Sequence, residues 1–278
     1  MSLLAVIRTV RPVFAPGLWL SLCVLIVVAL WALFPGAFSH QDPLVGDPLQ
    51  ALQPPSARHW FGTDHLGRDI YSRSVYGTAL TLQATLFSVA IAFLVGSTLG
   101  VLAGYIRGRF DSLLMRLIDI LMAVPGLLLA MAIITVLGFG TLHIAVAVGL
   151  SSVATFARLS RGEVLRARNH IFVDAARTGG VGHLTIIRRH ILPHALAPVL
   201  SLAALELGFA LLSVSALSFL GFGAPPPQPE WGLLIAEGRN YIAAAWWYTT
   251  LPGAAIALTV LATNRVAVFI QDYAEELC

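Results

Sequence analysis

The sequence predicts an all-α integral membrane protein, because its composition is strongly apolar and its apolar residues gather in long runs. Of its 278 residues, 58% are hydrophobic and 11% are charged, and the mean hydropathy is +0.83. A helix needs about 20 apolar residues to cross the hydrocarbon core of a bilayer. Six segments meet or approach that length: 17–34, 78–103, 113–137, 143–159, 195–220 and 251–270. We therefore expect about six transmembrane helices in a single domain over residues 1–278.

The two middle segments are less regular than the others. The third contains Pro125 followed by Gly126, and a proline removes a backbone donor and clashes with the preceding helical turn. We expect a kink there. The fourth segment, residues 143–159, is short for a transmembrane helix.

Arginine supplies all 17 basic side chains, because the chain contains no lysine. The Walker A phosphate loop of an ATPase uses a lysine to reach the nucleotide phosphates. This chain therefore holds no such site. Any ATP that drives it, with its Mg²⁺, must be bound and hydrolysed by partner subunits.

The arginines are unevenly distributed between the two sides that six crossings create. With the N-terminus in the cytoplasm, 13 of the 17 fall in cytoplasmic segments. Positive charge is held on the cytoplasmic side of membrane proteins. The sequence thus predicts that both termini are cytoplasmic. The asymmetry also explains the pI near 9.2, so no nucleic-acid partner is required.

The longest basic loop, residues 163–195, contains small residues and a glycine pair. Ile171, Phe172, Ala175 and Ala176 are expected to line one face of a short helix that also carries Asp174. Such a helix could lie close in a groove of another protein. The alternative is an amphipathic loop that lies only on lipid headgroups.

A turn and a second helix are expected to follow. Gly179 and Gly180 permit the positive φ of a backbone reversal. Beyond the turn, apolar residues recur at helical intervals, and a proline is expected to end the helix; these residues are Leu184, Ile187, Ile191 and Pro193.

The spacing in this loop resembles the EAA motif of ATP-binding-cassette importer permeases. That motif has an acidic residue and two alanines, a glycine four residues later, and a Leu-Pro pair twelve residues beyond the glycine. The corresponding residues here are Asp174, Ala175, Ala176, Gly180, His190, Leu192 and Pro193. Aspartate replaces the usual glutamate. The resemblance implies a cytoplasmic loop that couples this chain to an ATPase.

A second match lies between the first two apolar segments. The pattern GTDxxGRD is similar to a signature of the second permease in the dipeptide, oligopeptide and nickel importer family, and it is formed by Gly62, Thr63, Asp64, Gly67, Arg68 and Asp69. Residues 217–223 and 229–232 resemble further segments of that family. The matches extend over residues 60–232 and imply a type I ABC importer permease fold in the bacterial inner membrane.

The resemblance also implies function and partners. The chain would be a pore-forming subunit and not an enzyme, working in the lipid bilayer with a second homologous permease, two ATP-binding subunits and a periplasmic substrate-binding protein. Its substrate would be a di- or oligopeptide, or nickel or another metal chelate. Residues 60–69 look somewhat closer to nickel-type members.

The residues of the GTDxxGRD segment also have a purely structural interpretation. Asp64, Arg68 and Asp69 can form a turn joined by charge-assisted hydrogen bonds, with backbone freedom at Gly62 and Gly67. The functional alternative is direct contact with the substrate-binding protein.

The same loop carries two histidines. His59 and His65 lie near Asp64 and Asp69, but one short loop rarely completes a metal site unaided. We therefore expect no metal site.

Residues 222–247 form the other outer loop. The proline run after residue 224 ends the fifth helix. The stretch from Glu230 is expected to form a short amphipathic element at the outer membrane interface, with Trp246, Trp247 and Tyr248 at headgroup depth. The resemblance implies a plug-like periplasmic element near the mouth of the pore.

Ionisable residues inside the apolar segments are few. Glu206 lies midway along the fifth, where an isolated carboxylate is costly and should face protein or water. It either lines the translocation path or hydrogen-bonds a neighbouring helix or a partner subunit. Asp119 is expected to pair with Arg116 or Arg109.

The alternative function is a secondary transporter driven by an ion gradient. Such a protein would show an internal repeat, paired broken helices and several acids or histidines in the membrane. The sequence has no such repeat, and Glu206 is its clear midmembrane carboxylate. A membrane enzyme would need clustered catalytic groups, which the sequence does not show.

Overall fold

The structure is a computed structural model that describes residues 16–277, and the regular elements of that range are helices. In chain order they are α2 (Pro16–Leu33), α3 (Pro35–Phe38), η1 (Pro48–Gln50), α4 (Ile70–Ile91), η2 (Ala92–Gly96), α5 (Ser97–Ile106), α6 (Gly108–Ala123), α7 (Gly126–Leu137), α8 (Thr141–Arg168), α9 (Ile171–Thr178), α10 (His183–Ile186), η3 (Ile187–Ile191), α11 (Leu192–Phe219), α12 (Trp231–Gly238), η4 (Arg239–Tyr241) and α13 (Trp247–Leu277). The all-α prediction is confirmed. Residues 1–15 and Cys278, on which part of the predicted topology rests, lie outside the described range.

Within the described residues, four helical segments are long and apolar enough to cross a membrane: Ile70–Ile106, Thr141–Arg168, His183–Phe219 and Trp247–Asp272. The pair α6 and α7 makes a fifth if it is counted as one span, and α2 is a shorter apolar helix. Five of the six predicted segments therefore each fall on one helical segment, and the third, residues 113–137, covers the pair α6 and α7.

The break between α6 and α7 is complete, with an angle of 96° between the two helices. Val124 is extended, with φ −94° and ψ 130°. Because a residue before proline avoids the helical region, α6 cannot continue through Pro125. The predicted kink is confirmed. The fourth segment is longer than expected, since α8 continues through the arginine-rich stretch to Arg168.

Pro193 does not end a helix, so that prediction is wrong. It lies at the start of α11, which continues from α10 through the π-helical turn η3. The N–H of Leu192 donates to the carbonyl of Ile187, five residues back. This wider turn directly before Pro193 accommodates the ring that would clash in a regular helix.

Helices α5 and α8 pack at backbone distance along a row of glycines. Gly96, Gly100 and Gly104 are four residues apart, so they lie on one face. A Cβ at Gly100 would lie 2.4 Å from the carbonyl oxygen of Ala157. The small side chains thus allow the close approach that fixes α8 in the bundle.

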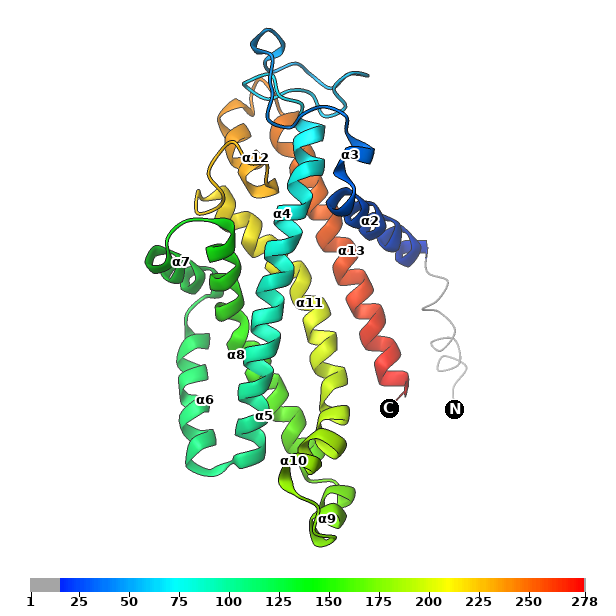
Figure 1. The fold of residues 1–278 in the computed structure, drawn as a ribbon, viewed down its shortest axis with the longest axis vertical. Coiled ribbons are helices and arrows are strands. Elements are labelled where there is room, and N and C mark those ends of the chain that lie inside the picture. The colour runs from blue at the N-terminus through cyan, green and yellow to red at the C-terminus, as the bar shows by residue number, and fades with distance from the viewer. Residues whose placement is uncertain (1–15, 278) are drawn as a thin grey trace.

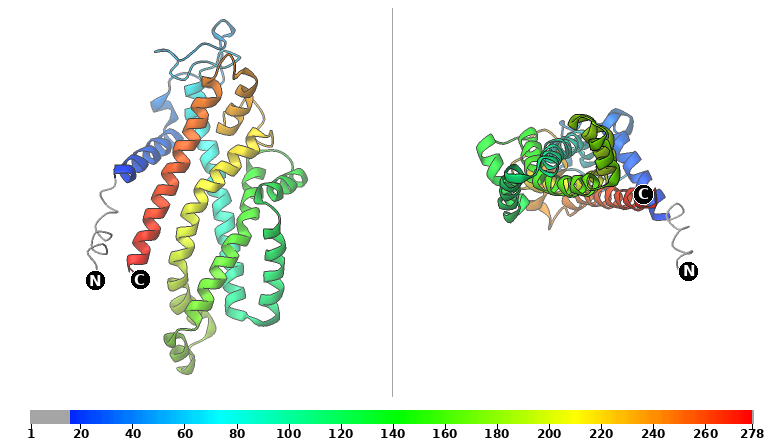
Figure 2. Two further views of the ribbon diagram at one scale, coloured as in Figure 1. Left: turned by 180° about the vertical axis from the view of Figure 1, so that it is seen from behind. Right: turned by 90° about the horizontal axis from the view of Figure 1, so that it is seen from below.

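The long helices run along the length of the molecule (Figure 1). One end carries α9 and is called the α9 end; the other carries residues 39–69 and α12 and is called the α12 end. Helix α6 lies at the edge of the bundle opposite α13, as Figure 2 also shows from behind. The largest core cluster joins α4, α7, α8 and α11 around the buried Phe156 and Val214.

Candidate functional site

Helix α9 projects at the α9 end and exposes most of its surface (Figure 1). Its buried residue is Val173, which is fully enclosed, whereas Ile171 is 87% exposed and Phe172 and Ala175 are exposed too. Of the four residues expected to line one face of this helix, Ile171, Phe172 and Ala175 are thus exposed. Because Val173 anchors the helix, the apolar residues on either side of it are left facing outward.

Asp174 lies on this outward surface. Its side chain is 68% exposed, and its Oδ1 lies 3.7 Å from Nη1 of Arg177. Ala176 is half-buried and packs at the edge of the cluster beneath α9. The acidic residue and Ala175 thus remain available to another protein.

A Schellman motif ends α9. The N–H of Val181 donates to the carbonyl of Ala176, and the N–H of Gly180 donates to the carbonyl of Arg177, both at 3.0 Å. Gly180 has φ +80°, as the glycine pair predicted, whereas Gly179 has φ −74°. Nothing lies within 4 Å of a Cβ built at Gly180, so the requirement for glycine there is conformational.

The segment after the turn is held to α8 and α11 by a buried cluster. Its members are Val164, Ala167, Val173, Ile186, Ile191 and Ala195. Of the apolar stripe expected from the sequence, Ile191 is fully buried but Leu184 is 60% exposed, and Ile186, which lies outside that stripe, is fully buried. The π-helical turn explains this, because its five-residue repeat aligns Ile186 with Ile191.

Three imidazoles surround the ring of Phe172 at the base of α9. His170 stacks on it at 5.4 Å between ring centroids, and His194 and His190 lie at 5.0 and 6.3 Å. Leu192 is half-buried and Pro193 is exposed. The structure thus gathers the predicted residues 174–193 into one compact projection.

At the α12 end, the GTDxxGRD segment forms a tight turn before α4. Oδ1 of Asp64 accepts from the backbone N–H groups of Leu66 and Arg68, and Oδ2 accepts from Nε of Arg68 at 2.6 Å. Gly62 and Gly67 have positive φ values of 72° and 73°. These are the charge-assisted contacts and glycine conformations that the sequence predicted.

Asp69 and Thr63 complete this turn. Asp69 caps α4 by accepting from the N–H of Ser72 at 2.7 Å, and Oγ1 of Thr63 accepts from the N–H of Gln53 at 2.8 Å. Asp64, Arg68, Asp69 and Thr63 are all buried. Their burial favours the structural interpretation over direct contact with a docking protein.

The histidines of this loop have partners within the chain. His59 lies between Oδ1 of Asp69, at 2.9 Å, and Oε1 of Gln50, at 3.0 Å. His65 stacks on Tyr241 and lies 3.2 Å from the hydroxyl of Tyr248. Residues 16–277 contain no group of three or more histidine, cysteine, aspartate or glutamate side chains suited to a metal ion.

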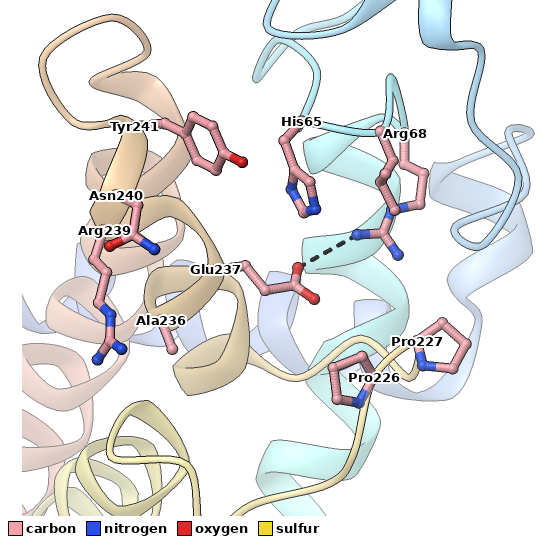
Figure 3. Close-up of a pocket in the computed structure, with 10 residues that line it drawn as sticks. His65, Arg68, Pro226, Pro227, Ala236, Glu237, Arg239, Asn240 and Tyr241 are labelled. Carbon is pink, nitrogen blue, oxygen red and sulfur yellow. Dashed lines mark hydrogen bonds and ion pairs between the residues drawn. The ribbon is translucent and has the colours of Figure 1, made fainter.

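A group of four charged side chains joins the turn to α12, and we call it the charge quartet: the buried Asp64, Arg68 and Arg73, and Glu237, whose side chain is 11% exposed. Oε2 of Glu237 lies 2.9 Å from Nη2 of Arg73 and 3.5 Å from Nη2 of Arg68, the contact drawn in Figure 3. Oδ2 of Asp64 lies 3.6 Å from Nη1 of Arg73. Each arginine therefore contacts both carboxylates, and the quartet is neutral as a whole.

Sequence reasoning missed Arg73 and Glu237. A signal for Arg73 was present, because an arginine in the first turn of an apolar helix must find a carboxylate. Which carboxylate it finds depends on the tertiary fold.

Helix α12 packs inside the protein, so the predicted interfacial element was wrong. Trp231 is fully buried, and its Nε1 donates to the carbonyl of Ser74 at 2.9 Å. Trp247 and Tyr248 are buried as well, whereas Trp246 is 54% exposed. The hydroxyl of Tyr248 donates to Glu237. Nε1 of Trp247 is buried and has no hydrogen-bond partner within the described residues.

Glu230 caps the start of α12 from a fully buried position. It accepts from the N–H groups of Gly232 and Leu233 at 3.1 Å and from the hydroxyl of Thr81 at 3.3 Å. Burial raises the pKa of the Glu230 carboxyl, and these hydrogen bonds oppose the shift. Helix α12 is thus tied to α4 at both of its ends.

Glu206 lies on α11 and faces α8. The hydroxyl of Ser152 donates to its Oε2 at 3.4 Å, and the glutamate side chain is only partly enclosed. The contact joins two long helices near the middle of the molecule. It is compatible with either of the two roles weighed for this carboxylate.

Helix α6 is held to α8 by two ion pairs. Asp119 contacts Arg158 at 2.5 Å, so the predicted pairing with Arg116 or Arg109 was wrong. Asp111 accepts from Nε and Nη2 of Arg161 at 2.5 and 2.7 Å. The antiparallel packing of α6 on α8 brings these partners together, which a pattern within α6 alone does not reveal.

Comparison with known proteins places the chain in a family. The family model described as "Binding-protein-dependent transport system inner membrane component" matches residues 96–276. The Probable D,D-dipeptide transport system permease protein DdpC of Escherichia coli is 39% identical over 252 residues, 91% of this chain and 85% of that protein. The Dipeptide transport system permease protein DppC of Alkalihalophilus pseudofirmus is 43% identical over 226 residues, 81% of this chain and 74% of that protein.

Other relatives are consistent with this. The Glutathione transport system permease protein GsiD of Pectobacterium atrosepticum is 38% identical over 265 residues, 95% of this chain and 87% of that protein. The fold resembles an inward-facing MetNI methionine ABC transporter, with a TM-score of 0.55, 19% identity and coverage of 71% of this chain and 96% of that one. An amino acid ABC transporter gives a TM-score of 0.58, 17% identity and coverage of 73% and 94%. The chain therefore belongs to the binding-protein-dependent transport system inner membrane component family and is a permease subunit of an ABC importer.

Proposed function

We propose that this permease subunit imports short peptides and that α9 transmits the work of ATP hydrolysis from a partner subunit. The observation that carries the proposal is the exposed surface of α9, where Ile171, Asp174 and Ala175 face outward from a helix anchored by Val173. An apolar surface of this kind on a projecting helix is suited to a groove of another protein.

Coupling in this proposal depends on the rigidity of the α9 projection. The buried cluster around Ile186 and Ile191 ties α9 to both α8 and α11. A displacement of α9 by an ATP-binding partner would therefore move both long helices. For ATP to drive the change, the partner must bind it with different affinity in the two states.

The proposed assembly contains a second homologous permease, two ATP-binding subunits and a periplasmic substrate-binding protein. In this arrangement the α9 end faces the cytoplasm and the α12 end faces the periplasm. The arginines support this orientation, because Arg166, Arg168, Arg177, Arg188 and Arg189 all lie near α9. Both termini are then cytoplasmic.

The proposed substrate class is short peptides. The relatives described above are named for D,D-dipeptide, dipeptide and glutathione transport, which supports a peptide more than the nickel or metal chelate that the sequence weakly favoured. Glu206 is proposed to border the translocation path. An ion-gradient mechanism is not favoured, because the chain belongs to an ABC importer family.

The test is uptake of labelled dialanine by cells in which the native gene is replaced by a variant. We expect Gly180→Val to abolish uptake and to weaken co-purification of the ATP-binding subunit, because valine cannot easily adopt φ +80°. Gly182→Val is the matched control, since Gly182 has φ −65° and open space around it. Equal uptake by the two variants at equal abundance would contradict the proposal.

A further inference from the structure

A pocket of about 540 Å³ opens at the α12 end between the GTDxxGRD turn and α12. Its walls include His65, Arg68, Pro226, Glu237, Arg239 and Tyr241. In Figure 3, His65, Arg68, Glu237 and Tyr241 face a common space, and Arg239 lies at its edge with its guanidinium directed away from Glu237. Its volume lies within the range of small-molecule sites, which is roughly 300–1,000 Å³. The pocket combines an apolar wall with charged groups of both signs.

Glu237 presents a carboxylate oxygen to this pocket. Its Oε2 is occupied by Arg73, Arg68 and the hydroxyl of Tyr248. Its Oε1 accepts no hydrogen bond from any residue in the described range, and the side chain is 11% exposed. The contacts with Arg73, Arg68 and Tyr248 hold the glutamate in position, while one oxygen remains free for a donor in the pocket.

Arg239 supplies the opposite charge. It is exposed and makes no hydrogen bond or ion pair within residues 16–277, and its guanidinium lies 5.9 Å from the ring centroid of Phe219. In Figure 3 the side chains of Glu237 and Arg239 leave the same short stretch of chain in different directions. The pocket therefore has a separate group for each end of a dipolar ligand.

Two stacked rings, His65 and Tyr241, line the pocket, and the buried ring of Tyr248 packs against them. His65 lies 5.4 Å from Tyr241 and 6.2 Å from Tyr248 between ring centroids, with nearly parallel planes. The hydroxyl proton of Tyr248 is donated to Glu237, so the hydroxyl oxygen accepts a hydrogen bond from Nδ1 of His65. These contacts fix the orientation of the imidazole and leave its Nε2 to the pocket. The opposite wall is apolar and includes Pro226, Pro227 and Ala236.

We propose that this pocket binds a short peptide in its zwitterionic form, with the ammonium group at Oε1 of Glu237 and the carboxylate at Arg239. The peptide class rests on the function proposed above. Two extended residues span at most about 7 Å, which fits a pocket of this size. An anion alone would meet the carboxylate of Glu237, and a cation alone would meet Arg239, so the pair of charges selects a ligand that carries both.

The test compares dialanine with two blocked forms on the purified full-length chain in lipid nanodiscs. N-acetyl-dialanine lacks the ammonium, and dialanine amide lacks the carboxylate. We expect saturable binding of labelled dialanine in equilibrium dialysis and at least about tenfold weaker competition by each blocked form, in line with about 1.4 kcal/mol per tenfold for a lost charge-assisted contact. No saturable binding of dialanine, or equal competition by the blocked forms, would overturn the proposal.

The Arg239→Gln variant tests whether Arg239 binds the carboxylate of the peptide. It should bind dialanine and dialanine amide equally while still rejecting the acetylated form, a pattern that general loss of structure does not produce. Arg58→Gln is the matched control, because Arg58 is an exposed arginine at the same end outside the pocket. If Arg239→Gln instead keeps full discrimination and only weakens association of the binding protein, the pocket receives an acidic side chain of that protein and the peptide assignment is wrong.

Different results would overturn this pocket proposal and the proposed function. Dialanine uptake that depends on this chain, together with no discrimination by the purified chain, overturns the pocket alone. Absence of any peptide uptake that depends on the chain overturns the proposed function.

Discussion

Glu237 of α12 accepts a 2.9 Å hydrogen bond from Nη2 of Arg73 in α4, although 164 residues separate them in sequence. Arg73 is fully buried, and the side chain of Glu237 is 11% exposed. Removing one partner of a buried pair leaves an uncompensated charge, which typically costs about 3–5 kcal/mol. The position of α12 therefore depends on a neutral quartet.

The quartet predicts non-additive mutations. Glu237→Leu leaves one buried positive charge in excess and Arg73→Met leaves one negative, whereas the double variant retains the neutral pair of Asp64 and Arg68. Each single change should lower the free energy of unfolding by about 3–5 kcal/mol, and the double change should cost at least about 1 kcal/mol less than their sum. Denaturation of the purified variants checks this, with Arg58→Met as an exposed control. Additive effects would show that the two residues are not coupled.

Substitution by alanine should have opposite effects on stability at two helical glycines, Gly100 in α5 and Gly162 in α8. Gly100→Ala should destabilise the chain, because the new Cβ would lie 2.4 Å from the carbonyl oxygen of Ala157. Gly162→Ala should stabilise it by up to about 1 kcal/mol, since nothing lies within 4 Å of that position and alanine favours the helix. Thermal unfolding of both variants measures the difference. Equal shifts would argue against close packing of α5 on α8.

Helix class and the main breaks could be read from the sequence, because they depend on local chemistry. The apolar runs predicted the helices, Pro125 predicted the break after α6, and Gly180 predicted the turn after α9. Pro193 shows the limit of this reasoning. A proline pattern does not reveal that a π-helical turn precedes it and lets the helix continue.

It was harder to predict which residues are buried in the core and which charged residues pair, because both depend on contacts between distant segments. Asp119 pairs with Arg158 on α8, and Trp231 is buried by packing against α4. A tryptophan beside apolar residues has the same local pattern at a membrane interface and in a protein core. The outer turn could be predicted more fully, since Asp64 and Arg68 lie only four residues apart.

Glu230 predicts a dependence of stability on pH. Burial raises the pKa of its carboxyl above the unfolded value of about 4.5. The folded state therefore binds this proton more tightly, and the resulting stabilisation is present below that pH and is lost as the pH rises through the folded pKa. Relative to Glu230→Gln, the native chain should lose stability from pH 4.5 upward. The difference in unfolding midpoint between the two proteins measures this, and a constant difference across pH would contradict it.

Substitution of Glu206 should affect transport without affecting the abundance of the protein. If the carboxylate borders the translocation path, Glu206→Gln removes its charge and should reduce dialanine uptake by about tenfold. The abundance of the protein should stay normal, because the amide oxygen can still accept from Ser152. Ser152→Ala is the control that removes only the hydrogen bond, at a cost of about 1 kcal/mol. Full uptake by Glu206→Gln would assign this residue to contacts between helices.

The central claim is that α9 contacts an ATP-binding subunit, and crosslinking at Ala175 tests it most directly. A photoreactive residue at Ala175, an exposed position of α9, is compared in cells with one at Ala57, which is also an exposed alanine and lies at the α12 end. The account predicts a crosslink from Ala175 to an ATP-binding subunit, with a yield that changes when ATP is depleted, and none from Ala57. A crosslink to that subunit from Ala57, or none from Ala175 in the assembled importer, would contradict both the coupling role of α9 and the proposed orientation.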